Sequence, residues 1–89
     1  MKAIVSVSAK DRKGIIAYVT KILADNDINV LDISQTLMQE YFAMIMLVDT
    51  SDCKLSFEEL SSLLKEKGEE QKLSILIQRE DIFDSMHKI

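Results

Sequence analysis

The stretch KAIVSVSAKDRKGIIAYVTKILADNDINVLDISQTLM, residues 2–38, decides the fold because its hydrophobic period changes twice along its length. Residues 2–8 contain β-branched residues and place apolar side chains on one face, which predicts a strand. Residues 14–26 carry apolar side chains at spacings of three and four, which predicts an amphipathic helix. Residues 29–38 return to the alternating pattern of a half-solvated strand. The stretch therefore predicts a strand, a helix and a second strand in that order.

Polar residues mark both ends of the expected helix. Asp11 lies just ahead of the apolar stripe and is a plausible start signal, because aspartate commonly caps the first turn of a helix. Asp25, Asn26 and Asp27 form a plausible stop, because their side chains compete for backbone hydrogen bonds. We expect the helix to occupy the residues between these two groups.

The next two strands form an expected hairpin. One face of the strand over residues 29–38 is apolar and consists of Leu31, Ile33 and Leu37. The short polar pair at 39–40 then connects to residues 41–48, which are apolar at every position. The length of this apolar run and the tight break before it favour a hairpin partner. Because both faces of the run are apolar, we expect it to be central in the sheet.

A second helix is expected over residues 56–67, after a polar loop over residues 49–54. Ser56 and Glu59 match a capping box at its start, and Gly68 suits its C-terminal stop. Beyond it, alternating apolar residues predict a last strand; these are Leu73, Ile75 and Ile77. The tail over residues 79–89 places apolar side chains on one helical face and predicts a short C-terminal helix; these side chains are Ile82, Phe83, Met86 and Ile89.

This order of elements favours an α+β, ferredoxin-like βαββαβ sandwich: an antiparallel four-stranded sheet with two helices on one face, plus the short C-terminal helix. A chain of 89 residues has room for one core, so residues 1–89 form a single domain. Such a sheet leaves its other face open. We expect Met44 and Met46, or their neighbours, to point there and make that face too apolar for a monomer. The sequence therefore predicts a homodimer, assembled either edge to edge or face to face.

Composition argues against several classes of protein. No apolar run approaches the ~20 residues of a membrane-spanning helix, and no export signal is recognisable, so we expect a cytoplasmic protein. The net charge of −4 disfavours direct binding of nucleic acid. Cys53 is the only cysteine, which excludes an internal disulfide and a thiolate metal cluster. We expect neither a metal nor a cofactor.

Side chains that could carry catalysis are few and scattered. His87 is the only histidine and lies among charged residues of the tail, where we expect it to be solvated. The acidic pairs at 58–59 and 69–70 lie on or beside an exposed helix, and nothing implies a pocket that would shift their pKa values. The sequence has no Walker-type loop, dinucleotide fingerprint or nucleophile elbow. These features predict a protein that is not an enzyme.

A local cluster of basic residues precedes Gly14 and could steer a small anion; it consists of Lys10, Arg12 and Lys13. The amides at the start of the first helix would suit a carboxylate. Gly14 either supplies a tolerant backbone or lets a ligand approach closely. Asn29 is either a turn residue or an amide that reads the polar ends of an amino acid. The residues alone leave both alternatives open.

Two motifs resemble the ACT domain: KDRKGII at residues 10–16 and DINVLDISQ at residues 27–35. More narrowly, the chain is similar to stand-alone ACT proteins related to the glycine cleavage system transcriptional repressor. The resemblance implies an amino-acid site in which the first loop faces the second strand of a neighbouring subunit. It implies Asp11, Gly14 and Ile15 in the loop, Asn29 and Val30 on the facing strand, and Arg12, Lys13 and Leu31 at the flanks. Lys13 stands where many such domains have proline.

Two functions are compatible with this sequence, and a third shares only the expected topology. The resemblance favours a regulatory module that senses a small amino acid at a homodimer interface and modulates amino-acid metabolism or a partner, such as an enzyme or a transcription factor. The alternative is a protein interaction module of the same fold with no small-molecule ligand. An acylphosphatase-type enzyme shares the topology, but the arginine and asparagine that it needs around a phosphate-binding loop are not recognisable here.

Overall fold

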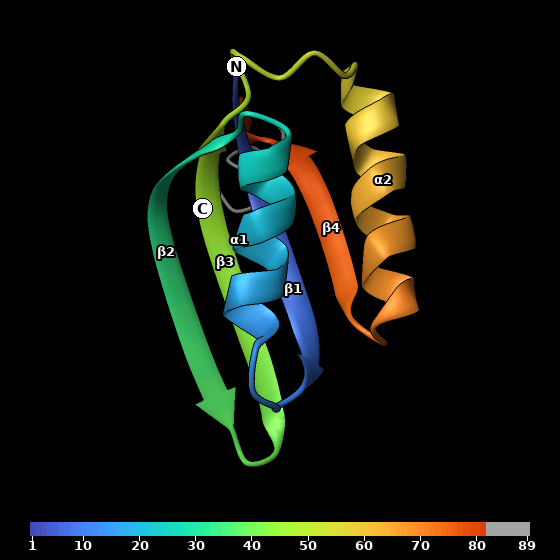
Figure 1. The fold of residues 1–89 in the computed structure, drawn as a ribbon. Coiled ribbons are helices and arrows are strands. Elements are labelled where there is room, and N and C mark those ends of the chain that lie inside the picture. The colour runs from blue at the N-terminus through green and yellow to red at the C-terminus, as the bar shows by residue number, and fades with distance from the viewer. Residues whose placement is uncertain (82–89) are drawn as a thin grey trace.

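The computed structural model describes residues 1–81, which form four strands and two helices (Figure 1). In chain order these are β1 Lys2–Lys10, α1 Ile15–Asp25, β2 Asn29–Met38, β3 Tyr41–Asp49, α2 Phe57–Glu70 and β4 Ser74–Arg79. This order confirms the one expected from the sequence. The apolar residues of the expected tail helix lie outside the described residues, as does His87. Neither described helix is long and apolar enough to cross a membrane.

The strands form one antiparallel sheet in the order β2-β3-β1-β4, and both helices cover the same face of it (Figure 1). This arrangement confirms the ferredoxin-like βαββαβ sandwich. β1 and β3 are the central strands, as expected for the continuously apolar third strand, whereas β2 and β4 are edges. Each edge strand has one side of its backbone that no other described strand pairs with.

Alternate residues of β3 face the helices and are buried; these are Phe42, Met44, Met46 and Val48. The expectation that Met44 and Met46 point to the open face is therefore wrong, and their neighbours point there instead. Ile45 is 45% exposed and lies on that face, where Ser6 of β1 separates it from Leu76 of β4. When both faces of a strand are apolar, the sequence does not indicate which set of alternate side chains faces the helices. In β3 the pairing with β1 decides this.

The start of α1 differs from the prediction, whereas its end does not. Gly14 is the N-cap, with φ 90° and no side-chain cap, so the proposed start signal at Asp11 is wrong. At the other end the Asn26 Nδ2 donates to the Ile22 carbonyl oxygen at 2.8 Å, and Asp27 takes a left-handed conformation with φ 58°. A left-handed residue directly after a helix turns the chain and closes the last carbonyls. The polar stop is therefore confirmed.

The capping box of α2 is confirmed. The Ser56 amide donates to Glu59 Oε1 at 2.9 Å, and the Glu59 amide donates to Ser56 Oγ at 3.1 Å. The expected stop at Gly68 is wrong, because the helix continues past it and Lys72 takes the left-handed position with φ 59°. A Cβ atom at Gly68 would lie 2.7 Å from the Leu73 carbonyl oxygen. This glycine therefore allows close packing of the helix against the chain that enters β4.

Replacing Lys72 by glycine is expected to stabilise the fold. A non-glycine residue in the left-handed region costs about 1–2 kcal/mol, so Lys72→Gly should raise the free energy of unfolding by about 1 kcal/mol. For a domain of this size that corresponds to a rise of about 4–8 °C in Tm, measured by thermal denaturation. Lys65→Gly, inside the preceding helix α2, is the matched control and should lower stability by about 1 kcal/mol. If both variants changed the free energy of unfolding in the same direction, this explanation would be wrong.

Candidate functional site

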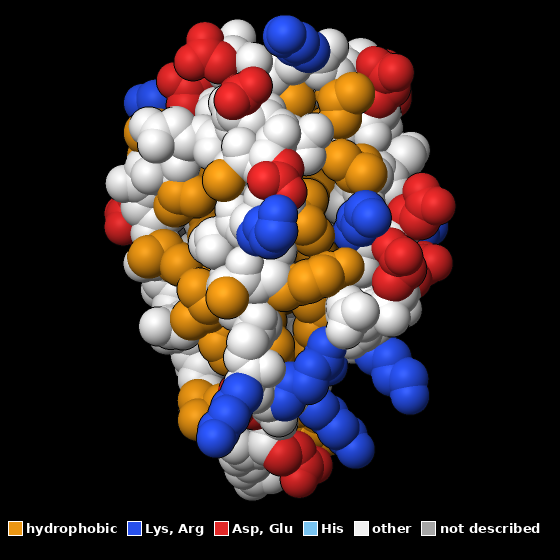
Figure 2. Space-filling model, viewed as in Figure 1, with side chains coloured by type: hydrophobic (Ala, Val, Ile, Leu, Met, Phe, Trp, Pro, Cys, Tyr) orange, Lys and Arg blue, Asp and Glu red, His pale blue; other side chains and the backbone are white. Residues whose placement is uncertain are grey.

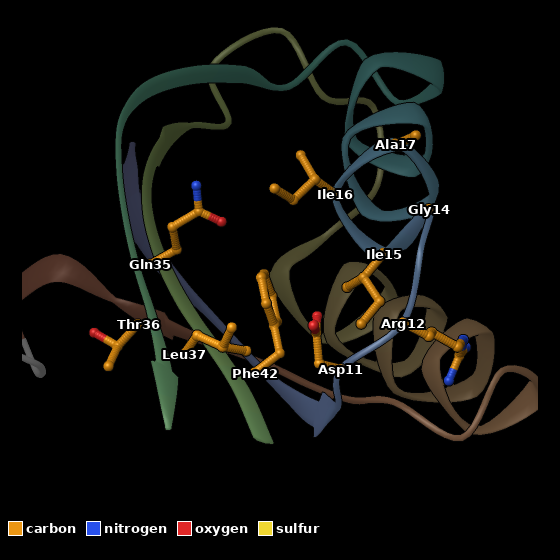
Figure 3. A pocket seen from close by; sticks show the side chains of 10 residues that line it. All are labelled: Asp11, Arg12, Gly14, Ile15, Ile16, Ala17, Gln35, Thr36, Leu37 and Phe42. Carbon is orange, nitrogen blue, oxygen red and sulfur yellow. The ribbon is translucent and has the colours of Figure 1, made fainter. Parts of the chain in front are cut away.

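A cavity of about 760 Å³ lies between the start of α1 and the second half of β2 (Figure 3). The β1–α1 loop, residues 11–14, forms one rim, and the start of β3 forms the base. Its lining residues are Asp11, Arg12, Gly14, Ile15, Ile16, Ala17, Gln35, Thr36, Leu37 and Phe42. This volume falls within the ~300–1,000 Å³ that is typical of small-molecule sites.

The cavity exists because α1 does not fill the space above β2. Ile33 and Leu37 pair with Met46 and Phe42 of β3, so they lie on the face that carries the helices. They nevertheless remain 42% and 60% exposed. The second strand was expected to be half-solvated, but in this single chain its apolar face is largely exposed as well. Figure 2 shows hydrophobic side chains at the surface over β2 and α1, on the left of the view.

The walls of the cavity are mostly apolar. Ile15 and Phe42 belong to the hydrophobic core, whereas Ile16 is 38% exposed and points into the cavity from α1 (Figure 3). Two polar side chains point into the same space from opposite sides, the Asp11 carboxylate from the loop and the Gln35 amide from β2. The cavity thus combines an apolar surface with a small number of polar groups, which is typical of ligand sites.

Two hydrogen bonds fix the β1–α1 loop. The Asp11 amide donates to the Glu40 carbonyl oxygen at 2.7 Å, which ties the loop to the turn between β2 and β3. The Arg12 guanidinium donates to the Gln71 carbonyl oxygen at the end of α2. Figure 3 shows Arg12 directed away from the cavity, although part of the residue lines it. Lys13 belongs to the loop but not to the lining.

Gly14 and the first turn of α1 form the remaining rim. The Tyr18 amide makes the first backbone hydrogen bond of α1, which it donates to the Gly14 carbonyl oxygen at 2.9 Å. The preceding amides have no side-chain cap, and the first turn holds no acidic residue. These amides carry the positive end of the helix dipole beside the cavity. No group of three or more metal-ligating side chains occurs within residues 1–81.

The structure does not bring Asn29, Val30 and Leu31 to this cavity within one chain. Asn29 pairs with Asp49, which in turn pairs with Lys2 at the start of β1. The loop instead follows Lys10, at the other end of that strand. Eight residue steps of about 3.3 Å separate the two ends of β1, roughly 26 Å. Leu31 lies at a register shift in the pairing of β2 with β3.

Sequence reasoning missed the residues that β2 and β3 contribute to the cavity. Leu37 and Phe42 were expected only as parts of strands and Ala17 only as part of a helix. Ile16 and Gln35 lie within the two motifs that carry the resemblance, but they were given no role at the site. The alternation of β2 places Gln35 and Leu37 on one face, but it does not indicate that the face borders a cavity. That information comes from the position of α1 above the sheet.

Comparisons with known proteins agree with this fold. A family model described as ACT domain matches residues 2–78. The chain is 55% identical over its whole length to the whole of a UPF0237 protein from Clostridium acetobutylicum. The structure of an ACT domain protein from Streptococcus pneumoniae has a TM-score of 0.84 at 40% identity, covering 98% of each chain. A candidate glycine cleavage system transcriptional repressor has a TM-score of 0.72 at 18% identity, covering 86% of this chain and 44% of its own, which supports the fold alone.

The glycine at the rim has a backbone conformation that other residues rarely adopt, and no other described part of the chain crowds it. A Cβ atom at Gly14 would meet nothing within 4 Å, but its φ of 90° is unfavourable for other residues. Gly14→Ala should therefore lower the free energy of unfolding by about 1–2 kcal/mol in chemical denaturation. Gly14→Asn should lose less although its side chain is larger, because asparagine tolerates positive φ. A greater loss with asparagine would indicate a steric requirement.

Proposed function

The chain belongs to the ACT domain family, and from this membership we propose that it is a regulatory module that binds a small amino acid at the interface of a homodimer. ACT domains are in general regulatory modules that bind amino acids. The observation that carries the proposal is the cavity beside the β1–α1 loop, which is bordered by the edge strand β2. Regulation would arise because a ligand shifts the population of one assembly over another.

The free edge of β2 supports a dimer that completes this site. β2 is an edge strand of ten residues that carries exposed apolar side chains on its faces, which is a hazard for a monomer; they are Leu31, Ile33, Leu37 and Met38. Two copies of β2 paired antiparallel about a twofold axis would place the start of one strand beside the end of the other. Asn29 of one copy would then lie near Leu37 of the other, at the cavity.

This arrangement accounts for the separation of the expected site residues within one chain. The β1–α1 loop, with Asp11 and Gly14, would come from one subunit, and Asn29 and Val30 would come from the other. The amino acid would contact both subunits, so its binding energy would favour the dimer. Arg12, Lys13 and Leu31 would flank the site.

The open face of the sheet favours a second candidate, an interaction module without a small-molecule ligand. Ile45 is 45% exposed and Leu76 is 58% exposed on that face, and Met38 and Tyr41 near the hairpin turn are more than half exposed. Large exposed apolar side chains in one region are typical of protein contact sites. A face-to-face dimer or a partner protein could cover them.

Neither candidate involves catalysis. Two carboxyl groups of the described residues have shifted pKa values, and both shifts are downward. A hydrogen bond from the Ser51 side chain lowers the pKa of Asp49, and one from the Ser56 amide lowers the pKa of Glu59. A carboxyl group that acts as a general acid near neutral pH needs a raised pKa, so these two groups are unsuited to that role. From the membership of the ACT domain family we propose a non-catalytic protein.

Thermal denaturation in the presence of each common amino acid tests the sensor. A ligand that binds only the folded state at a hundredfold excess over its Kd adds about 2.7 kcal/mol, so Tm should rise by several degrees with one or a few amino acids. Size-exclusion chromatography of the same samples should show a dimer that the ligand stabilises. If no amino acid changes Tm, the sensor is excluded and the interaction module becomes the better explanation.

Cysteine crosslinking tests the assembly. In a Cys53→Ser background, Ser34→Cys places a thiol near the middle of β2, where antiparallel pairing brings it close to its own copy. Leu76→Cys is the matched control, because it points to the same open face as Ser34 but lies in the opposite edge strand, β4. Oxidation should produce a crosslinked dimer of the Ser34 variant in non-reducing electrophoresis and leave the Leu76 variant monomeric. The reverse result would indicate face-to-face assembly and remove the basis for a shared site.

A further inference from the structure

The cavity carries information on the class of ligand. On the basis of the proposed function, we infer that the site selects an α-amino acid with a large apolar side chain and holds its ammonium group at the Asp11 carboxylate. The inference rests on the directions of the Asp11, Arg12 and Gln35 side chains and on the apolar composition of the cavity walls.

Asp11 provides a negative charge with no competing partner within residues 1–81. Its backbone amide is fixed by the Glu40 carbonyl oxygen, and its carboxylate points into the cavity (Figure 3). Among the described residues, no hydrogen bond or ion pair occupies this carboxylate. A carboxylate at the rim of an apolar cavity favours a cationic group there, and a charge-assisted hydrogen bond adds direction to the attraction.

Arg12 does not balance this charge inside the cavity. Its guanidinium donates to the Gln71 carbonyl oxygen and is directed towards the end of α2. Lys13 contributes nothing to the lining. The charged group presented to a ligand is therefore Asp11, and an acidic ligand side chain beside it would be repelled.

The walls provide a surface for an apolar side chain. Ile16 from α1 and Leu37 from β2 face the cavity, with Phe42 beneath them (Figure 3). Ile16 and Leu37 keep 38% and 60% of their surfaces exposed, so a ligand can remove further apolar area from water. A cavity of about 760 Å³ leaves most of this surface wet around glycine or serine. Leucine, isoleucine, methionine and phenylalanine would cover more of it.

Gln35 completes the recognition on the side of β2. Its amide points into the cavity opposite Asp11 and offers both a donor and an acceptor. A neutral amide cannot neutralise the charge of a second ionised group placed within the apolar walls. The cavity therefore disfavours lysine and arginine, whose side chains would carry a second positive charge against Ile16 and Leu37.

Calorimetry and thermal denaturation with the full chain test this selection. Leucine and phenylalanine should bind at least about tenfold more tightly than serine, because their side chains bury more apolar area. The probe 4-methylpentanoate, which is leucine without its amino group, should leave Tm unchanged. Asp11→Asn keeps the size of the side chain and should weaken leucine binding about tenfold or more. Asp52→Asn, the same change at an exposed residue outside the cavity, is the matched control and should retain the affinity of the unmodified chain, provided that both variants show the native circular dichroism spectrum.

The outcomes separate this inference from the proposed function. Binding of a small polar or acidic amino acid in preference to leucine, or equal affinity of Asp11→Asn and the unmodified chain, would overturn the inference and leave the amino-acid sensor standing. Binding of 4-methylpentanoate as tight as that of leucine would also overturn it. A flat response to every amino acid would overturn both, because the site would then hold no amino acid at all.

Discussion

The pairing of β1 with β3 is the constraint on which the rest of this structure depends. The register that sets Lys10 opposite Tyr41 brings the β1–α1 loop beside the β2–β3 turn, where the Asp11 amide bonds to the Glu40 carbonyl oxygen. The same register decides which residues of β3 face the helices, and Phe42 thereby becomes the base of the cavity. A shift of one residue would exchange the buried and open faces of the central strand and remove both the core and the site.

The sequence was sufficient to predict the fold because its local signals agree with one another. The change of period between residues 2–8 and 14–26 predicts β1 and α1, and the capping box at Ser56 marks the start of α2. The signals that failed depend on backbone conformation or tertiary contact. Lys72 occupies the left-handed position after α2. Gly68 instead lies within the helix, where the Leu73 carbonyl oxygen leaves no room for a Cβ atom. Composition alone does not distinguish these two uses of glycine.

The candidate site was predicted only in part. The resemblance placed Asp11, Gly14 and Ile15 at the site, and the cavity includes all three. It also placed Asn29 there, but from a neighbouring subunit, and within a single chain this residue is separated from the loop by the length of the sheet. The contribution of Gln35 was not predictable, because the cavity above β2 results from how far α1 lies from the sheet. Distances between packed layers depend on many side chains together and leave no local pattern in the sequence.

The cavity and the free edge of the sheet belong to the same strand, and this has a thermodynamic consequence. Leu37 lines the cavity and is also exposed along the edge that the proposed dimer would cover. A ligand that contacts both subunits binds the dimer more tightly than the monomer. By linkage, the same ligand strengthens the association of the two subunits. No movement within a subunit is required for regulation of this kind. Under the proposed function, the domain would therefore transmit the presence of a small molecule through its state of assembly alone.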